Sequence, residues 1–140
     1  MSKTFEYRRR VEFCDTDAAG IVHFSSFFLY MEQAEHAFWR HLGLSVFRQS
    51  AGDLLVSWPR VSVSCQYRGP VAFEDEVDLQ LSIARLGDKS VTFKFAMSVK
   101  GRHVADGETT AVCCRVHDSH SLESVKIPEE FRTKLAAYLP

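Results

Sequence analysis

The amino-acid sequence predicts an α+β fold in which one long apolar helix packs against an antiparallel sheet. Three observations predict it. The chain of 140 residues fits a single domain, which we place at residues 1–140. Apolar residues recur at helical spacing from about Ser25 to Gly43. Four later segments alternate apolar and polar residues between short turns, so one helical layer and one sheet layer are expected.

The first predicted strand covers residues 5–13. Its alternation is imperfect, but one face carries apolar side chains and the other carries charged ones. The apolar face holds Phe5, Tyr7, Val11 and Phe13. Residues 15–20, which follow, are small and polar, and we interpret them as a loop.

The long helix is expected to begin at Ser25 or Ser26, because either hydroxyl can cap it, and to end before Gly43. Further aromatic residues, among them Trp39, widen its apolar surface beyond one stripe. We therefore expect other elements to wrap around this helix. The residues at steps of three and four are Phe27, Met31, Ala34, Phe38 and Leu42.

Four more strands are predicted by alternating residues. They cover residues 61–67, 77–83, 91–99 and 104–116. Short turns at residues 68–70, 86–88 and 101–102 indicate that consecutive strands are antiparallel neighbours. Near the end of the chain, Pro128 followed by Glu129 and Glu130 predicts the first turn of a short helix.

Composition narrows the classes of partner. The net charge of −1 gives no field that favours nucleic acid or a membrane as the main partner. No apolar run approaches the roughly 18 residues that span a bilayer. The four cysteines lack CxxC spacing, so we expect reduced thiols in a cytoplasmic protein. His36 and His41 are not at the spacing of a helical zinc pair, and we expect no metal and no cofactor.

Residues 11–24, VEFCDTDAAGIVHF, resemble the signature of the 4-hydroxybenzoyl-CoA thioesterase family, which includes the bacterial YbgC-like acyl-CoA thioesterases. In that family an aromatic strand end precedes D-x-D-x-x-G-[IV]-V and the long helix. The resemblance extends over nearly the whole chain, with similar segments at residues 43–44, 58–59, 67–70 and 73–75. It implies a hot-dog fold, in which a five-stranded curved antiparallel sheet wraps around the central helix. It also implies a homo-oligomer of dimers, often paired into homotetramers, with active sites at the dimer interface.

The resemblance makes Asp17 the catalytic carboxylate. Thioester hydrolysis needs a group that attacks the carbonyl carbon or activates water, and donors that stabilise the oxyanion. The first turn of a helix has unpaired N–H groups, and we expect the Phe24 or His23 backbone N–H to bind the thioester oxygen. Asp17 would act as nucleophile or as general base, and the sequence leaves both open. Asp15 is expected to have a structural role instead.

Other polar residues near this motif have alternative roles. The His23 side chain could polarise the thioester, but packing against the acyl pocket is favoured. Phe24 replaces a Tyr or His common at this position, so a donor role is expected from its backbone only. Ser25 and Ser26 are expected to cap the helix rather than act as nucleophiles. Glu32 on the long helix is the second candidate for the catalytic carboxylate.

Substrate contacts are expected in two further places. The resemblance implies that Arg85, Lys89 and Ser90, near the turn between the third and fourth strands, contact the CoA phosphates. The acyl pocket should be apolar and should include Trp58 together with aromatic residues of the helix.

The expected function is hydrolysis of an aromatic or short-to-medium acyl-CoA to free acid and CoA. Alternative substrates are acyl groups on acyl carrier protein, or 1,4-dihydroxy-2-naphthoyl-CoA. A non-catalytic hot-dog module that binds acyl-CoA is a second class, although such a module has no need for Asp17. A hot-dog dehydratase, with Asp17 and His23 as its acid and base, is a third.

Overall fold

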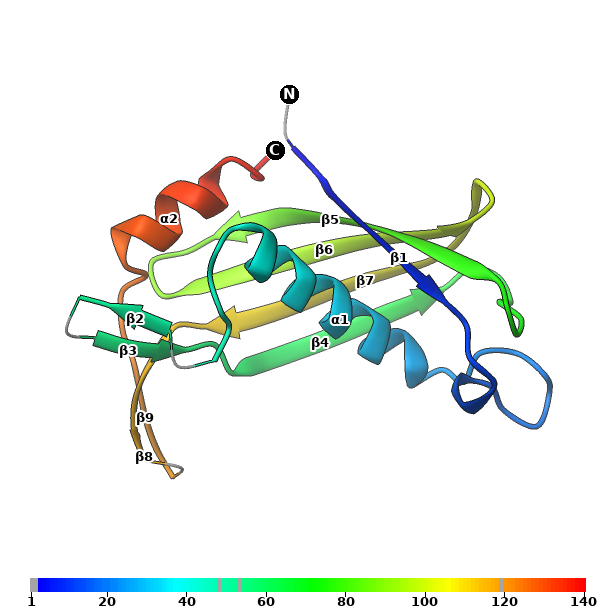
Figure 1. Cartoon of the computed structure of the whole chain (residues 1–140), viewed down its shortest axis with the longest axis horizontal. Coiled ribbons are helices and arrows are strands. Elements are labelled where there is room, and N and C mark those ends of the chain that lie inside the picture. The colour runs from blue at the N-terminus through cyan, green and yellow to red at the C-terminus, as the bar shows by residue number, and fades with distance from the viewer. Residues whose placement is uncertain (1–2, 48, 53, 119) are drawn as a thin grey trace.

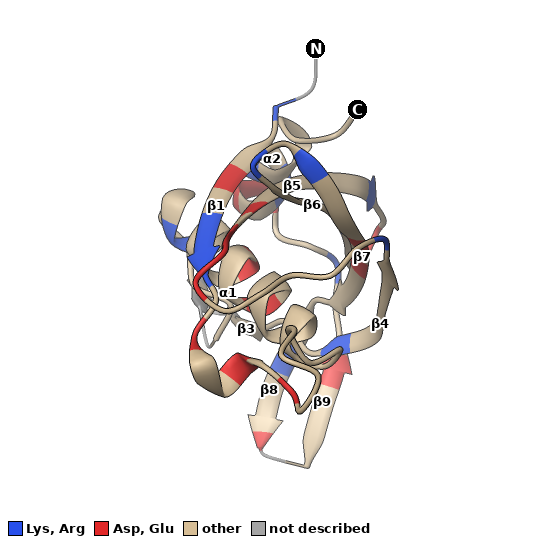
Figure 2. Cartoon of the chain, turned by 90° about the vertical axis from the view of Figure 1, so that its right-hand side faces the viewer, with Lys and Arg blue, Asp and Glu red and all other residues tan. Residues whose placement is uncertain are grey.

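The computed structural model describes residues 3–47, 49–52, 54–118 and 120–140. Within these ranges the main sheet has five antiparallel strands in the order β1-β5-β6-β7-β4. Helix α1 (Ser26–His41) lies along one face of this sheet, and the sheet curls around it (Figure 1; Figure 2). The strands are β1 (Phe5–Arg10), β4 (Arg60–Tyr67), β5 (Glu76–Leu86), β6 (Ser90–Val99) and β7 (Arg102–Val112).

A smaller sheet lies at one end of the main sheet, where β5 ends (Figure 1). Its strands, within the same described ranges, follow the order β2-β3-β8-β9. They are β2 (Gln49–Ala51), β3 (Leu54–Ser57), β8 (Cys114–Asp118) and β9 (Ser121–Ser124). Helix α2 (Glu129–Ala136) packs near the same end, with Pro128 as its N-cap.

Helix α1 ends where Gly43 was expected to stop it. Gly43 has a φ of 76°, a left-handed conformation that other residues adopt only with strain. The Gly43 N–H donates to the Arg40 carbonyl, and the Leu44 N–H donates to the Trp39 carbonyl. These two bonds satisfy carbonyls that the end of the helix would otherwise leave unpaired. The sheet curls around α1 as expected (Figure 2), but the buried residues of the helix lie on the side that faces the sheet, and Leu29 is 53% exposed.

The core lies between α1 and the inward residues of the central strands. Burial alternates along β5 and β6, as the sequence pattern predicts. Gly107 in β7 lets α1 approach closely, because a Cβ at this position would overlap the Met31 sulfur. The largest buried side chains of these strands are Phe93, Phe95, Leu79, Leu81, Ile83 and Met97.

The prediction of one strand over residues 104–116 is wrong, because this segment forms two strands that belong to different sheets. Strand β7 ends at Val112, and β8 begins at Cys114 in the smaller sheet. Between them, Cys113 is fully buried. Its N–H donates to the Lys89 carbonyl, and its carbonyl accepts the Val125 N–H. These partners draw the chain away from the ladder with β6.

The first predicted strand is too long. Strand β1 ends at Arg10, and Phe13 opens a single 3₁₀ turn in which its side chain is 75% exposed. The Glu12 N–H donates to the Asp15 carboxylate at 2.8 Å, so the chain turns here instead of extending. The alternation had indicated that Phe13 packs in the core, but its side chain lies outside it.

The turn at residues 68–70 does not make β4 and β5 neighbours, as was expected. Strand β4 pairs with β7 and forms an edge of the sheet, whereas β5 pairs with β1 and β6. Residues 68–75 instead cross from one side of the fold to the other. On the way, the Val71 carbonyl accepts the Val22 N–H, and Ala72 forms a bridge with Ile21. This crossing segment holds the loop that precedes α1.

Candidate functional site

The loop before α1 is a tight antiparallel hairpin with Asp17 near its tip. Thr16 and Val22 form a bridge, and the Asp17 N–H donates to the Ile21 carbonyl at 2.9 Å. Gly20, with a φ of 82°, allows the reversal. One Asp17 carboxylate oxygen accepts the Ala19 N–H at 2.8 Å. The Asp17 side chain is partly exposed, so its other oxygen remains accessible to a ligand.

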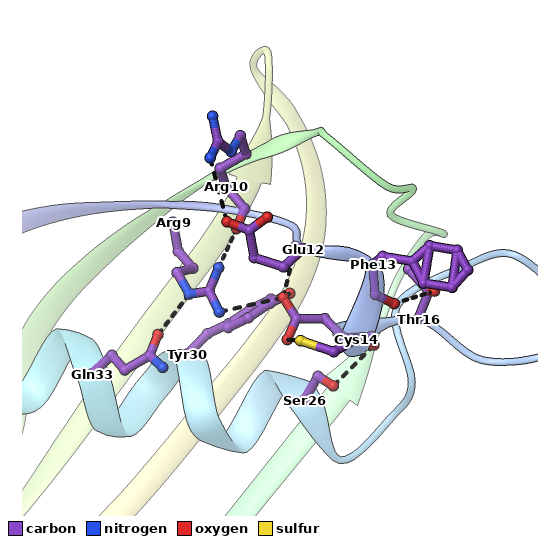
Figure 3. Close-up of polar contacts among 10 residues, drawn as sticks. Arg9, Arg10, Glu12, Phe13, Cys14, Thr16, Ser26, Tyr30 and Gln33 are labelled. Carbon is purple, nitrogen blue, oxygen red and sulfur yellow. Dashed lines mark hydrogen bonds and ion pairs between the residues drawn. The ribbon is translucent and has the colours of Figure 1, made fainter.

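Asp15 at the base of this hairpin is buried. Figure 3 labels the residues that bind it, among them Arg9, Tyr30 and Ser26. Its Oδ2 accepts the Tyr30 hydroxyl at 2.9 Å and lies 3.3 Å from the Arg9 guanidinium. Its backbone carbonyl accepts the His23 N–H at 2.8 Å and the Ser26 hydroxyl at 3.0 Å. The structural role expected for Asp15 is confirmed by these contacts.

A cavity of about 400 Å³ opens beside Asp17. Its walls come from the hairpin, the start of α1, the end of β4 and the crossing segment. The surface is mostly apolar, and the Asp17 carboxylate is the charged group in its wall. The lining residues are Asp17, Ile21, Val22, Phe24, Phe27, Tyr67, Gly69, Pro70 and Val71.

The two backbone donors expected for an oxyanion differ in availability. The His23 N–H is already bound to the Asp15 carbonyl. Within the described part of the chain, the Phe24 N–H has no acceptor, and Phe24 lines the cavity. The Tyr67 hydroxyl donates to the Phe24 carbonyl at 2.8 Å and so fixes this residue. Of the two expected N–H donors, the Phe24 N–H is therefore the one that is available to bind an oxyanion.

The His23 side chain packs rather than projecting into the cavity. Its ring stacks on that of Phe24 with centroids 4.3 Å apart, and its Nδ1 lies 2.8 Å from the Ser25 hydroxyl. Ser25 occupies the N-cap position of α1, but its side chain does not make the expected capping bond. The Ser26 hydroxyl is also bound elsewhere, to Asp15. The expectation that a serine side chain caps α1 is wrong, because both hydroxyls serve the hairpin instead.

A second cavity, of about 470 Å³, lies between α1 and the smaller sheet. Glu32, His36, Trp58 and Arg60 contribute to its walls. Trp58 is buried between Trp39 and Phe131, with ring centroids at 5.0 and 5.9 Å. Glu32 therefore faces a different cavity from Asp17 within one chain.

A buried ion pair lies behind this second cavity. The Arg60 guanidinium is 2.7 Å from the Glu35 carboxylate, which is fully buried and also accepts the Trp39 indole N–H. Burial raises the pKa of the Glu35 carboxyl, and Arg60 acts against that change. Burial and the nearby Arg60 lower the pKa of His36. The pair ties α1 to the beginning of the edge strand β4.

The residues expected to contact CoA lie far from Asp17 within one chain. Arg85, Lys89 and Ser90 surround the turn between β5 and β6. Asp17 lies near the start of β5, because its hairpin pairs with residues 71–72, which precede that strand. Ten steps along β5, at about 3.4 Å each, separate the two ends by roughly 34 Å. Trp58, which precedes β4, lies at the same distant end. One chain thus brings Asp17, His23 and Phe24 together but leaves Trp58, Arg85, Lys89 and Ser90 at the other end.

Sequence reasoning missed several walls of the Asp17 cavity. Tyr67 was placed on a strand but not in the site, although its position directly before the turn at residues 68–70 is a usable signal. Of the helix aromatics expected in the acyl pocket, Phe27 does line the cavity. Tyr30 does not, because it is fully buried in the core.

Three further observations concern metal binding, thiols and membrane insertion. Among the described residues, no group of three or more His, Cys, Asp or Glu side chains is arranged to hold a metal ion. All four cysteines are free thiols, and Cys113 and Cys114 are buried. None of the described helices is both long and apolar enough to cross a membrane.

In sequence and in fold, the chain is similar to known thioesterases. Residues 11–135 match the model of a family described as the thioesterase-like superfamily. A relative from Aquifex aeolicus with the general name of an esterase is 32% identical over 126 residues, which cover 90% of this chain and 93% of the relative. A 1,4-dihydroxy-2-naphthoyl-CoA hydrolase from Prochlorococcus marinus is 30% identical over 128 residues, with 87% and 81% covered. The structure of a gentisyl-coenzyme A thioesterase is 29% identical with a TM-score of 0.79, and the match covers 94% of this chain and 99% of that one.

Proposed function

Because the chain belongs to the thioesterase-like superfamily and is a thioester hydrolase, we propose that it hydrolyses an acyl-CoA to the free acid and CoA. The α+β fold, with one long helix against an antiparallel sheet, matches that of hot-dog thioesterases. The cavity beside Asp17 is the observation that carries the proposal. It offers a carboxylate and an unpaired backbone donor to the same apolar space.

The proposed chemistry assigns one role to each group. The thioester oxygen accepts a hydrogen bond from the Phe24 N–H, and the start of α1 adds its positive dipole end. The Asp17 carboxylate attacks the carbonyl carbon directly, or removes a proton from the water that attacks it. The carbon–sulfur bond then breaks, a carbon–oxygen bond replaces it, and CoA leaves as a thiolate that takes up a proton. When water is the nucleophile, the product is the free acid; when Asp17 is the nucleophile, the product is a mixed anhydride, which water then cleaves to release the acid and restore the carboxylate. One oxyanion donor contributes about 3 kcal/mol to lowering such a barrier.

The cavity supports an apolar acyl group of modest size. Phe27, Tyr67 and Val71 supply aromatic and branched walls, and about 400 Å³ accommodates a ring or a short chain. The named relatives act on aromatic acyl-CoA esters, namely gentisyl-CoA and 1,4-dihydroxy-2-naphthoyl-CoA. We therefore place aromatic and short-to-medium acyl-CoA esters first among the substrates, ahead of esters on acyl carrier protein.

We further propose that residues 1–140 form one domain that works as a homodimer. Strand β4 is an edge strand, and its helix-side residues Val61 and Val63 are 64% and 51% exposed. An exposed apolar edge of this kind favours pairing with another strand. A second copy of β4, paired antiparallel, would cover it and continue the sheet. Assembly of two dimers into a tetramer stays a prediction.

Antiparallel pairing of β4 would also bring the two cavities together. Tyr67 at the end of β4 borders the Asp17 cavity, whereas Arg60 at its start borders the second cavity. A two-fold axis through the middle of the strand places the end of one copy beside the start of the other. Trp58, Arg85, Lys89 and Ser90 of one copy would then approach Asp17 of the other. This arrangement supports their proposed contacts with substrate, which one chain alone cannot make.

The reducing cytoplasm remains the proposed location. Four free thiols support it, because exposed thiols such as that of Cys14 persist where the environment is reducing.

Hydrolysis of a panel of acyl-CoA esters, followed by release of the CoA thiol, tests the proposed function. The wild type should hydrolyse at least one aromatic or short-chain ester. Asp17→Asn should reduce kcat by about 100-fold or more, because it removes the attacking or proton-accepting group but keeps the side-chain shape. Glu6→Gln, which changes an exposed carboxylate of β1 that lines neither cavity, is the matched control and should keep wild-type turnover. Wild-type turnover by Asp17→Asn would overturn the assignment of Asp17.

A further inference from the structure

Asp15 is a buried carboxylate that the proposed reaction does not use, since it does not line the Asp17 cavity. Three donors converge on its Oδ2, and Figure 3 labels the residues that supply them. They are the Glu12 N–H at 2.8 Å, the Tyr30 hydroxyl at 2.9 Å and the Arg9 guanidinium at 3.3 Å. One buried oxygen therefore joins β1, the 3₁₀ turn and the second turn of α1.

The partners of Asp15 are themselves held in place. Arg9 donates to the Gln33 side chain at 2.8 Å and lies over the Tyr30 ring, with its guanidinium carbon 5.1 Å from the ring centroid. Burial, followed by the hydrogen bond to Asp15, raises the pKa of Tyr30, so its hydroxyl keeps its proton and remains a donor. Each group in this cluster has a partner, which makes the cluster rigid.

The backbone of Asp15 carries this rigidity to the reacting groups. Its carbonyl accepts the His23 N–H, which closes the base of the hairpin. Asp17 lies two residues beyond Asp15 on one arm, and the Phe24 N–H follows directly after His23 on the other. Both proposed catalytic groups are thus attached to the same pair of residues. A shift of Asp15 relative to α1 would move them both.

Resting on the function proposed above, we propose that Asp15, held by Tyr30 and Arg9, is a positioning residue for hydrolysis. It sets the orientation of the Asp17 carboxylate and of the Phe24 N–H relative to α1, without touching the substrate. Misplacement of a reacting group by about 1 Å can cost roughly 100-fold in rate, so small changes in this cluster have a measurable effect.

Steady-state kinetics of Tyr30→Phe, Asp15→Asn and Asp15→Ala test the proposal. Tyr30→Phe removes one hydroxyl and keeps the ring in the core, so it should fold. We expect kcat to fall about 10-fold and KM to change less than about twofold, because orientation is lost while the apolar binding walls remain. Asp15→Asn, which keeps an acceptor oxygen, should lose less activity than Asp15→Ala.

Tyr138→Phe is the matched control. It removes a hydroxyl from another buried tyrosine, which packs on Phe38 with ring centroids 4.8 Å apart and does not line the Asp17 cavity. It should keep the wild-type kcat. All variants are assayed well below the temperature at which each unfolds, so that loss of folded protein does not enter the rates. An unchanged kcat in Tyr30→Phe and Asp15→Asn would overturn the proposal.

The double variant Tyr30→Phe/Asp17→Asn separates positioning from general weakening of the fold. If Tyr30 acts partly through Asp17, the second substitution should lower the residual rate of Asp17→Asn by clearly less than about 10-fold, because only the share carried by the Phe24 N–H is left to lose. A further 10-fold loss would mean that the two residues act independently, which contradicts the proposal. Failure of the proposed function is distinguishable, because Asp17→Asn alone would then retain its activity whatever Tyr30→Phe does.

Discussion

Asp15 and Asp17 lie two residues apart and have different surroundings. Asp15 is buried among three donors, whereas Asp17 is partly exposed beside an apolar cavity. Sequence reasoning identified the loop and assigned the two roles through a family resemblance. The residues alone could not make that assignment, because Tyr30, which binds Asp15, is distant in sequence. The same limit applied to Tyr67, whose link to Phe24 spans 43 positions.

The cysteines give a prediction at the residue scale. Burial raises the pKa of the Cys113 thiol to about 12, whereas Cys14 is exposed. Only the thiolate reacts quickly with iodoacetamide, so native protein at pH 8 should be labelled at Cys14 while Cys113 is protected. Mass spectrometry of peptides after brief labelling measures this. Unfolding in urea is the control and should expose both, and rapid native labelling of Cys113 would contradict the described burial.

At the scale of elements, the periodicity of apolar residues predicted the helices and strands that depend on contacts between residues close in the sequence. The long helix, its end at Gly43 and the alternating strands β4, β5 and β6 were predicted because neighbouring residues decide them. The smaller sheet was not predicted. Its strands depend on Cys113 leaving the main ladder for Lys89 and Val125, and such distant partners leave no periodic signal. The crossing segment at residues 68–75 was not predicted either, because its partners, Ile21 and Val22, are also distant in sequence.

The contact between α1 and β7 gives a prediction at this scale. A side chain at Gly107 would overlap the Met31 sulfur in the packed core. Gly107→Ala should therefore lower the free energy of unfolding by about 1–3 kcal/mol, the usual cost of overpacking. Urea unfolding followed by circular dichroism measures it. In a Met31→Ala background the same substitution should cost much less, and an equal cost in both backgrounds would rule out this contact as the cause.

At the scale of the whole molecule, the predicted site residues separate into two groups at opposite ends of the sheet. Asp17, His23 and Phe24 lie near the start of β5, and Trp58, Arg85, Lys89 and Ser90 lie near its end. A sequence does not show whether two groups meet within one chain or between two. The exposed edge of β4 is the structural feature that favours a meeting between two copies.

Disruption of the β4 edge tests the proposed dimer. Val63→Lys places a charge on the apolar face of the edge strand, where pairing with a second copy would have to bury it. We expect sedimentation analysis to show a monomer and the hydrolysis rate to fall with the fraction of dimer. Ser64→Lys, on the opposite face of the same strand, is the control and should remain dimeric. A Val63→Lys variant that stays dimeric with full activity would contradict this interface.

The central claim is that the Asp17 carboxylate and the Phe24 N–H meet at one thioester carbon. A crystal structure of Asp17→Asn with an unhydrolysed aromatic acyl-CoA tests it most directly. We expect the thioester oxygen within hydrogen-bond distance of the Phe24 N–H, and the residue-17 side chain beside the carbonyl carbon. A thioester bound only in the second cavity, beside Glu32 of its own chain and away from residue 17 of any copy, would contradict the claim.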